Sequence, residues 1–418
     1  MQSVESYLNE IIAAITLLPP EDLPLDQADG AVLAVDAITS WPLPGFDNSA
    51  MDGYAVRAAD VAGATEEHPV TLPVDAEVAA GDTASYAVKP GRSVKIMTGA
   101  LLPDGADAVI PVEWTDDGRE TVSITRAAAA GNAIRRAGGD AKPGDLLLPA
   151  GTRLGAAQIG VLAAAGHGTV RARRRPRVTV ISTGNELAEP GSPLVPGRIW
   201  DSNSYMLAAA ARQAGCEATR HAMLPDDPKA VLAAIEQAAA TADLLMTSGG
   251  VSMGGEHDVV KAALTKLGTV TFRKVAMQPG MPQGFGLIGT ASTSGAGRAA
   301  DGGPPGTATP IFTLPGNPVS AFVSFRLFVE PAVRALQGLR AEPALPRTAR
   351  LVAAITSPDG KRSFLRANFD RVTGSVTPLT GQNSHQIASL ARADSLIIIP
   401  ESVTSLPAGQ TVDVLELP

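Results

Sequence analysis

Between residues 178 and 336, short apolar runs alternate with longer segments of helical periodicity. Residues 178–183 (VTVIST), 244–246 (LLM) and 271–276 have the character of buried strands, and a helical pattern follows the first two of these runs. Strands that alternate with helices of about 10 to 15 residues indicate βαβ units and a mainly parallel sheet. This part of the chain is therefore predicted to be an α/β domain.

The segment LLMTSGGVSMGGEHD, residues 244–258, is predicted to run from a strand through a glycine-rich turn into a helix. Such a turn collects backbone N–H groups at the positive end of a helix, where a phosphate or oxyanion binds. Glu256 and Asp258 follow, and carboxylates beside phosphates indicate Mg²⁺. An ordinary α/β turn with acidic capping explains the same residues. The motif alone leaves both interpretations open, because it matches neither a Walker loop nor GxGxxG.

Ligands of open parallel sheets bind at the carboxyl ends of the strands. That rule selects three loops, 182–186, 224–228 and 248–258, all of which carry carboxylates or glycines. We expect them to lie on one edge of the sheet and to form a site there.

Capping patterns predict where several helices begin. Asn203 is expected to cap a helix that ends near residue 214, and Asp226-Asp227-Pro228 to begin another. In PGNP, Asn317 is the predicted cap and Pro318 the first helical residue, and capping alone explains both.

The flanking regions have a different pattern. Residues 3–17 and 154–165 have helical periodicity, and residues 26–37 are interpreted as a short helix. Residues 46–135 and 346–418 contain short β-rich runs between Gly, Asp and Pro turns, which predicts two β domains. Residues 291–310 are of low complexity and are interpreted as an insertion without a role in the site.

Composition limits the class of protein. A net charge of −8 argues against nucleic acid or an anionic membrane as the main partner. The single cysteine, Cys216, cannot form a disulfide framework and is expected to be buried packing. No apolar run is long enough to cross a membrane, and the N-terminus lacks a basic signal region, so we expect a cytoplasmic protein. The basic run RARRRPR, residues 171–177, is interpreted as a solvated linker in preference to an anion-binding patch.

Eight segments, in this order, resemble the molybdopterin molybdenumtransferase family, which includes MoeA and the gephyrin E domain. The segments are FDNSAMDGYAVR, KIMTGALLPDGADAV, RRAGGD, STGNEL, DSN, LPDDP, TSGGVSMG and LPGNPVS. They extend over most of the chain, and their shared order is far more specific than any single motif.

The resemblance implies a multidomain α/β protein. It predicts an elongated helical or linker domain (1–44 and 138–175), a β domain (45–137), a three-layer, MogA-like α/β domain (176–338) and a C-terminal β-barrel-like domain (339–418). It implies a homodimer with its active site across the subunit interface. It also implies a transferase that places molybdate on the dithiolene of adenylylated molybdopterin, with Mg²⁺-assisted release of AMP.

The resemblance also suggests roles for individual residues. The catalytic set is Asp52, Thr98, Asp140, Glu186 and Lys274. The substrate-binding set, completed by the backbone of the glycine-rich turn, is Ser248, Gly249, Gly250, Ser252, Gly254, Pro315, Asn317, Pro318, Arg366 and Ser384. Asp226 and Asp258 are the expected Mg²⁺ ligands.

Two departures from the family pattern bear on the site. Gln278 and Met281 stand where the family often has lysines, and Gly254-Gly255 is one residue longer than the common turn. Three alternatives remain: a protein that carries the finished cofactor without turnover, a related enzyme that uses tungstate, and an adenylyltransferase. The extra domains argue against the last of these.

Overall fold

The structure is a computed structural model of the chain, and it describes residues 1–249, 251, 259–289, 308–342 and 345–418. The chain forms two compact units. The first unit comprises Met1–Glu21, Gly30–Val32 and Ala172–Pro418, and the second comprises Asp22–Asp29 and Leu33–Arg171. The four-domain division expected from the sequence stays a prediction, and most of the low-complexity segment 291–310 lies outside the described residues.

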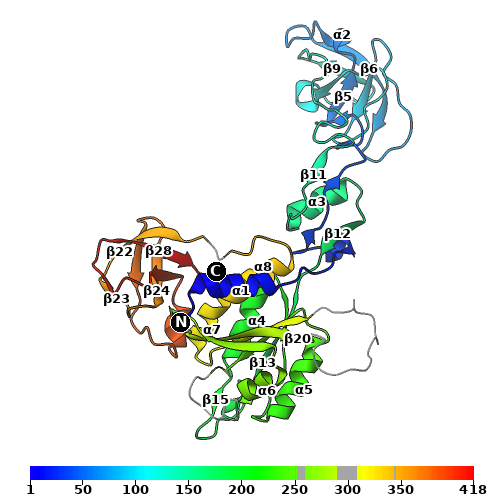
Figure 1. Ribbon diagram of the computed structural model, residues 1–418. Helices are drawn as coiled ribbons and strands as arrows, with labels where there is room; N and C mark the ends of the chain where they lie inside the picture. Colours follow the sequence, from blue (N-terminus) through cyan, green and yellow to red (C-terminus); the bar gives the residue numbers. More distant parts are fainter. Residues whose placement is uncertain (250, 252–258, 290–307, 343–344) are drawn as a thin grey trace, which may run out of the picture. The chain divides into compact units, whose positions relative to one another are not determined.

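A 6-stranded sheet forms the centre of the first unit, in the order β16-β13-β17-β21-β20-β18 (Figure 1). Its strands are β13 (Arg177–Ser182), β16 (Glu217–Arg220), β17 (Leu244–Ser248), β18 (Val270–Lys274), β20 (Pro282–Ile288) and β21 (Thr309–Leu314). Parallel pairing joins β16, β13, β17 and β21, whereas β20 is antiparallel to both of its neighbours. The prediction of a mainly parallel α/β sheet is therefore confirmed.

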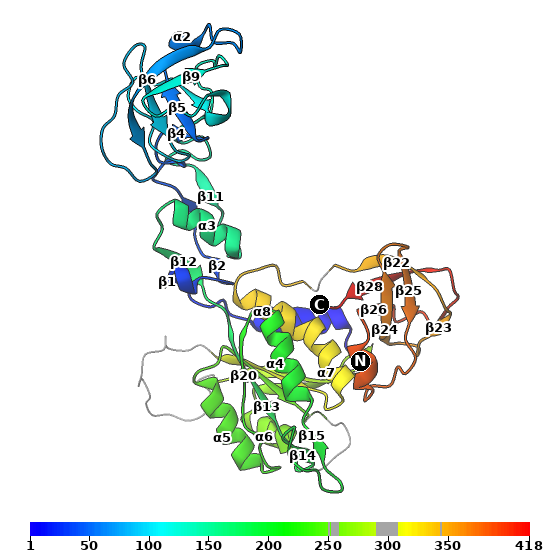
Figure 2. The ribbon, with the colours of Figure 1, turned by 180° about the vertical axis from the view of Figure 1, so that it is seen from behind.

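Helices cover both faces of this sheet (Figures 1 and 2). On one face, α5 (Pro228–Ala239) and α6 (Val259–Leu267) pack against Ile181, Leu245 and Ile311. The other face supports α1 (Val4–Ala14), α4 (Asn203–Gln213), α7 (Pro318–Ser324) and α8 (Glu330–Leu336). The result is a three-layer α/β arrangement.

The N-terminal helix α1 belongs to the core of this unit. Its side chains Tyr7 and Ile11 are buried in the same cluster as the α7–α8 helix. The ring of Tyr7 meets the ring of Phe328 edge-on, with centroids 4.9 Å apart. A π-helical segment, η3 (Phe325–Val329), joins α7 to α8, so that residues 318–336 form one continuous helix, as their periodicity predicts.

A closed set of strands follows at the C-terminus (Figure 2). The sheet runs in the order β19-β24-β25-β22-β28-β26, and an additional pairing of β24 with β26 closes it into a barrel. Its elements are β19 (Met277–Gln278), β22 (Arg347–Leu351), β24 (Arg362–Asp370), β25 (Ser375–Pro378), α9 (Ile387–Ala391), β26 (Ser395–Ile399) and β28 (Thr411–Glu416), with β23 (Ile355–Thr356) and β27 (Ser405–Leu406) paired beside it. The expected C-terminal β structure is present.

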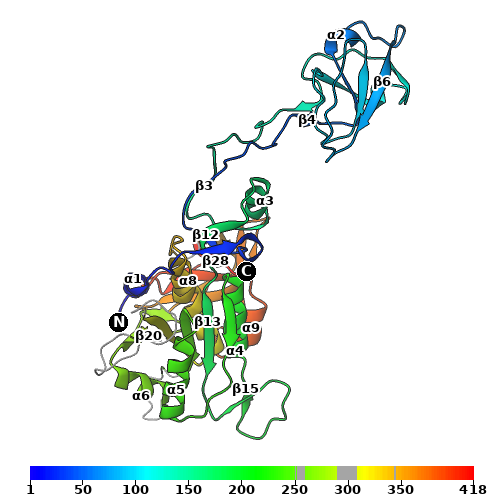
Figure 3. The same ribbon diagram turned by 90° about the vertical axis from the view of Figure 1, so that its right-hand side faces the viewer.

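The second unit contains a 5-stranded sheet in the order β8-β5-β7-β6-β9 (Figure 3). Its strands are β5 (Gly53–Val56), β6 (Val70–Val78), β7 (Ser93–Ile96), β8 (Ala108–Pro111) and β9 (Thr121–Ile124). Smaller elements in and beside this unit are β1 (Glu21–Pro24), η1 (Leu25–Gln27), β2 (Val32–Leu33), β3 (Ala37–Ile38), β4 (Asn48–Ser49), α2 (Ala58–Val61), η2 (Val112–Trp114), β10 (Ile134–Arg135), β11 (Leu146–Leu148), α3 (Ala156–Ala164) and β12 (Thr169–Arg173).

The prediction of a helix at residues 26–37 is wrong. A short 3₁₀ turn and two-residue strands occupy this segment instead, and they pair with segments that are distant in the sequence. Long-range strand pairing overrides the weak local helical pattern here.

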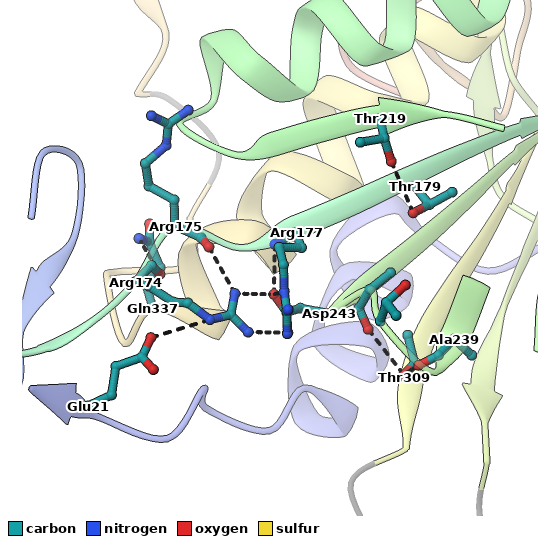
Figure 4. A network of polar contacts seen from close by, with 12 residues as sticks. Glu21, Arg174, Arg175, Arg177, Thr179, Thr219, Ala239, Asp243, Thr309 and Gln337 are labelled. Carbon is teal, nitrogen blue, oxygen red and sulfur yellow. Dashed lines mark hydrogen bonds and ion pairs between the residues drawn. The ribbon is translucent and has the colours of Figure 1, made fainter. Parts of the chain in front are cut away.

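The basic run 171–177 lies at the boundary between the two units, as expected of a linker between domains, but it is not simply solvated (Figure 4). Arg174 donates two hydrogen bonds to the carboxylate of Asp243, at 2.6 and 2.8 Å, and Arg175 donates to the carbonyl of buried Cys216. The backbone N–H of Arg177 donates to Asp243 as well, at 2.6 Å. These arginines therefore join the start of β13 to Asp243 and Cys216 of the same unit.

No helix of the described residues is long and apolar enough to span a membrane.

Candidate functional site

The carboxyl ends of β13, β16, β17 and β21 meet at one edge of the central sheet, as the three-loop prediction requires. Thr183 forms a bridge with Leu224, which joins the loop after β13 to the loop after β16. The backbone N–H of Asn185 donates to the carboxylate of Asp226 over 3.0 Å. Two of the three predicted loops are thus in direct contact.

Asn203 connects the remaining loops of this edge. Its amide nitrogen donates to the Oγ of Ser248 over 2.8 Å and to the carbonyl of Gly316 over 2.6 Å. The prediction that Asn203 caps α4 is wrong, because Ser202 occupies the cap position and Asn203 is the first helical residue. Its side chain crosses the ends of β17 and β21 instead.

A cavity of about 670 Å³ opens beside these loops in the first unit. The α/β sheet, the loop before β20 and the C-terminal barrel together supply its walls. The residues that line it are Glu186, Gly249, Val251, Met277, Gln278, Pro279, Gly280, Met281, Pro282, Pro315, Gly316, Asn317, Ser320, Lys361, Gln382, Asn383 and Ser384. The structure therefore brings together five of the predicted site residues, Glu186, Gly249, Pro315, Asn317 and Ser384.

The PGNP turn presents its polar atoms to this cavity. Asn317 occupies the cap position of α7, with Pro318 after it, as predicted. In the described part of the chain, however, its side chain makes no capping hydrogen bond, and it is exposed on the cavity wall. Capping therefore does not account for the asparagine, and its amide is available to a ligand.

Arg366 lies within the barrel strand β24 and is only 1% exposed. One terminal nitrogen of its guanidinium donates to the carbonyl of Gly381 over 2.6 Å. No described residue accepts a hydrogen bond from its Nε or Nη1. Burial lowers the pKa of this arginine, which remains charged because its normal pKa is so high. A buried cation with unused donors is unfavourable unless an anion approaches it.

The backbone of Arg366 is joined to the cavity wall through Gln382. The Oε1 of Gln382 accepts from the backbone N–H of Arg366 over 3.0 Å, and its Nε2 donates to the Arg366 carbonyl over 2.9 Å. The neighbouring carbonyl of Ser384 accepts from Val319, at the start of α7. The strand of Arg366, the loop of Ser384 and the PGNP turn thus form one connected wall.

The loop from Gln278 to Pro282 also lines the cavity. Gly280 has a φ of +99°, and a Cβ there would lie 3.0 Å from the Oγ of Ser324. The amide of Gln283 donates to both the Gly280 carbonyl and the Ser324 Oγ, at 2.6 Å each. This buried network fixes the loop whose residues Gln278 and Met281 line the cavity.

Two predicted catalytic residues of the first unit occupy different places. Glu186 lines the cavity, and Gly184 beside it has a φ of +150°, which favours glycine; a Cβ there would require the Glu186 carboxylate to move. Lys274 is exposed at the carboxyl end of β18, next to the cavity loop. Among the described residues, the lining set does not include Lys274, Ser248 or Pro318.

The second unit gathers the remaining predicted catalytic residues on adjoining loops. Asp52 accepts from the backbone N–H of Thr98 over 2.6 Å and from its Oγ1 over 2.7 Å. These hydrogen bonds, that of the side chain first, lower the pKa of Asp52. Nearby, the carboxylate of Asp47 accepts from Arg136 over 2.6 Å, which places the segment before Asp140 beside the FDNSAMDG loop. Asp140 is exposed there.

Only part of the expected metal site can be described. Asp226 is exposed, and one of its carboxylate oxygens is engaged by Asn185. Its predicted partner Asp258 lies outside the described residues, as do Gly250, Ser252 and Gly254. The described residues contain no group of three or more His, Cys, Asp or Glu side chains that could hold an ion. Mg²⁺ needs only one or two carboxylates when substrate oxygens and water complete its shell, so the donor at Asp226 fits it.

The sequence analysis missed several polar residues of this region. Asn203 has a capping pattern, which concealed its bridging role. Ser320, Lys361, Gln382 and Asn383 line the cavity and were not among the predicted residues. Only the packing of the barrel against the α/β sheet brings Lys361 to the cavity, and no sequence signal could have shown that.

Comparison with known proteins covers nearly the whole chain. Residues 2–166 match the MoeA N-terminal region (domain I and II), residues 179–335 a probable molybdopterin binding domain, and residues 348–417 the MoeA C-terminal region (domain IV).

Similar full-length proteins are known. Molybdopterin molybdenumtransferase 2 of Mycobacterium tuberculosis (strain ATCC 25618 / H37Rv) is 44% identical over 424 residues, which is 100% of both chains. The molybdopterin molybdenumtransferase of Bacillus subtilis (strain 168) is 35% identical, over 92% of this chain and 86% of its own. A crystal structure of the molybdopterin biosynthesis MoeA protein from Pyrococcus horikosii matches with a TM-score of 0.76 and 32% identity, over 99% of this chain and 98% of that one. The matching regions, their order and the shared fold establish that this chain belongs to the MoeA family of molybdopterin molybdenumtransferases.

Proposed function

We propose that this protein is a molybdopterin molybdenumtransferase that acts in molybdenum cofactor biosynthesis. Membership of the MoeA family supports the proposal, because similar proteins carry that name over their whole length. The observation that carries it for this chain is the cavity of about 670 Å³ at the carboxyl edge of the sheet, with the strand of buried Arg366 joined to its wall.

In the proposed reaction, adenylylated molybdopterin and molybdate are the substrates. The two thiol groups of the dithiolene give up their protons and their sulfurs bind molybdenum, while one molybdate oxygen takes up these two protons and leaves as water. A water molecule attacks the phosphoanhydride, whose bond breaks, so that AMP leaves and the pterin phosphate remains. Every reacting group is an anion or develops negative charge, so catalysis depends on fixed positive charge, hydrogen-bond donors and positioning.

Molybdate is proposed to bind on the barrel side of the cavity. Arg366 has donors that the described residues leave unused, and Ser384 and Asn317 supply neutral donors on the same connected wall. A buried guanidinium is well suited to an oxyanion because its charge and several N–H groups are fixed in one plane. The glycine-rich turn after β17, which starts at Gly249, is proposed to bind the terminal phosphate of the pterin.

Asp226 and Asp258 are proposed to hold Mg²⁺. When bound, the ion would neutralise negative charge on the anhydride that is cleaved. The contact from Asn185 orients the Asp226 carboxylate and leaves its second oxygen available. Glu186 is proposed to position a water molecule or the dithiolene, since its carboxylate lines the same cavity.

Asp52, Thr98 and Asp140 lie in the second unit, and we propose that they act on the same substrate. The resemblance predicts a homodimer whose active site uses both subunits, and that arrangement remains a proposal. Within the unit, two hydrogen bonds from Thr98 lower the pKa of Asp52 and so favour its ionised form. An ionised carboxylate can orient a water or accept its proton during cleavage.

The decisive experiment measures AMP release from adenylylated molybdopterin by the purified protein. We expect release that requires both molybdate and Mg²⁺ and stops when EDTA is added. Asp226→Asn should raise the Mg²⁺ concentration needed for half-maximal release, by about tenfold if one ligand contact is worth a charge-assisted hydrogen bond. Tight binding of the substrate without release of AMP would contradict this proposal and would favour a protein that carries the cofactor. Tungstate in place of molybdate tests which oxyanion is preferred.

A further inference from the structure

Lys361 is the positively charged residue among those that line the cavity, and Glu186 is the negatively charged one. Both belong to the described part of the first unit, and the remaining lining residues are neutral. A lysine at a cavity wall has a simple structural explanation if a carboxylate pairs with it. Among the described residues, none lies within ion-pair distance of Lys361, whose side chain is half-buried.

The neighbouring Arg362 shows what a paired cation looks like at this point. Its guanidinium pairs with Glu5 and with Glu401, at 3.1 Å from the latter. The two ion pairs direct the side chain of Arg362 toward the glutamates, whereas Lys361, which directly precedes β24, lines the cavity.

The backbone at Lys361 is fixed on both sides. The N–H of Gly360 donates to the carbonyl of Glu401 over 2.9 Å, and the N–H of Arg362 donates to the carbonyl of Ala276, also over 2.9 Å. In addition, Met277 lies opposite Arg362 in the parallel pairing of β19 with β24. Lys361 thus emerges beside the loop that carries Gln278 and Met281.

We propose that Lys361 binds the molybdate dianion in this cavity and supplies the positive charge on its wall. The inference rests on the proposed function. Two observations support it: Lys361 is the cation among the residues that line the cavity, and its half-buried ammonium has no carboxylate partner among the described residues. A dianion on this wall would neutralise the ammonium of Lys361 at a half-buried position, where charge interactions are stronger than in bulk water. Lys361 thereby takes the electrostatic role that Gln278 and Met281 cannot fill.

Three variants test the assignment. Lys361→Gln removes the charge, and Lys361→Arg retains it. Arg350→Gln is the matched control, because Arg350 is an exposed cation on β22 of the same barrel and does not line the cavity. All three are compared at one ionic strength, since salt screens such interactions.

The first measurement is isothermal titration of the full-length protein with sodium molybdate. We expect Lys361→Gln to weaken binding by at least about tenfold, the loss typical of one hydrogen bond to a charged group. Lys361→Arg and Arg350→Gln should stay within about threefold of the parent protein, since neither removes charge from the subsite. Equal affinities for the parent and Lys361→Gln, or no saturable binding by the parent, would overturn the inference.

The second measurement is steady-state AMP release. In Lys361→Gln, the KM for molybdate should rise with little change in kcat, whereas the KM for adenylylated molybdopterin should not change. A rise confined to the KM for adenylylated molybdopterin would assign Lys361 to a phosphate and contradict the proposal. Lys361-dependent molybdate binding without AMP release would sink the proposed function but not this inference. If AMP release depends on molybdate but is unchanged in Lys361→Gln, the proposed function stands and this inference is wrong.

Discussion

The carboxylate of Asp52 accepts two hydrogen bonds from one residue, Thr98, whose backbone N–H and hydroxyl lie 2.6 and 2.7 Å from the same oxygen. The two residues are 46 positions apart in the chain. Both bonds favour the ionised carboxylate, and together they hold its pKa below the ordinary value for aspartate.

Thr98→Val should raise the pKa of Asp52, because the variant loses the hydroxyl but keeps the backbone donor. Thr98→Ser should leave it nearly unchanged. A carbon-detected NMR titration of the Asp52 carboxyl would measure both. If ionised Asp52 is needed for turnover, the acidic limb of the rate profile should move to higher pH in Thr98→Val alone. Identical titration curves for the two variants would refute the role of the hydroxyl.

Asp243→Asn should destabilise the first unit by about 2 to 3 kcal/mol at pH 7, which is below the range for fully buried pairs because Arg174 is partly exposed. Burial opposes ionisation of Asp243, but hydrogen bonds from Arg174 and Arg177 outweigh it, so its pKa lies below the usual value. Because the pKa of Asp243 is lower in the folded than in the unfolded state, the ionised carboxylate stabilises the folded state at pH values above its unfolded pKa. This stability is lost as the pH falls through the folded-state pKa.

The difference in melting temperature between the parent protein and Asp243→Asn should therefore be largest near neutral pH and should shrink below about pH 4. Calorimetric scans across that range would measure it. A difference that is constant with pH would show that packing, and not charge, is responsible.

Arg366→Met should leave the melting temperature unchanged or raise it, since the side chain is buried with two nitrogens that no described residue accepts. The same variant should weaken molybdate binding by at least about tenfold. Thermal scans with and without molybdate separate the two effects. A strongly destabilised variant would instead mark Arg366 as a structural residue.

Asn203→Ala removes the link from α4 to Ser248 and Gly316. Each lost bond costs about 1 kcal/mol, so stability should fall modestly. The value of kcat/KM for AMP release should fall by about tenfold or more, because two loops of the site lose their relative position. Ser202→Ala is the control, since in the described structure this cap residue makes no capping hydrogen bond. Equal losses in both variants would show that only the helix start matters.

Local patterns predicted much of the fold. Apolar runs followed by helical periodicity identified β13, β17 and their helices, because each element is encoded in its own residues. The cap at Asp227 and the proline at position 228 were likewise readable, since capping involves only neighbours. The segment 26–37 was misread because its pairing partners lie far away in the chain.

The site was predictable only in part. That the loops after β13, β16 and β17 share one edge follows from the geometry of parallel strands, and the resemblance supplied Glu186 and Ser384, which line the cavity. The bridging amide of Asn203 was hidden, because the same residue type at a helix start is explained by capping.

The sequence by itself determined the alternation of strands and helices, the position of the glycine-rich turn and the family. The tertiary structure alone decided which side chains meet. Closure of the barrel through β24 and β26, and its packing against α7, bring Lys361 and Ser384 to a cavity whose other wall begins at Glu186. Such juxtapositions depend on contacts between residues far apart in the chain, which no local pattern of residues encodes.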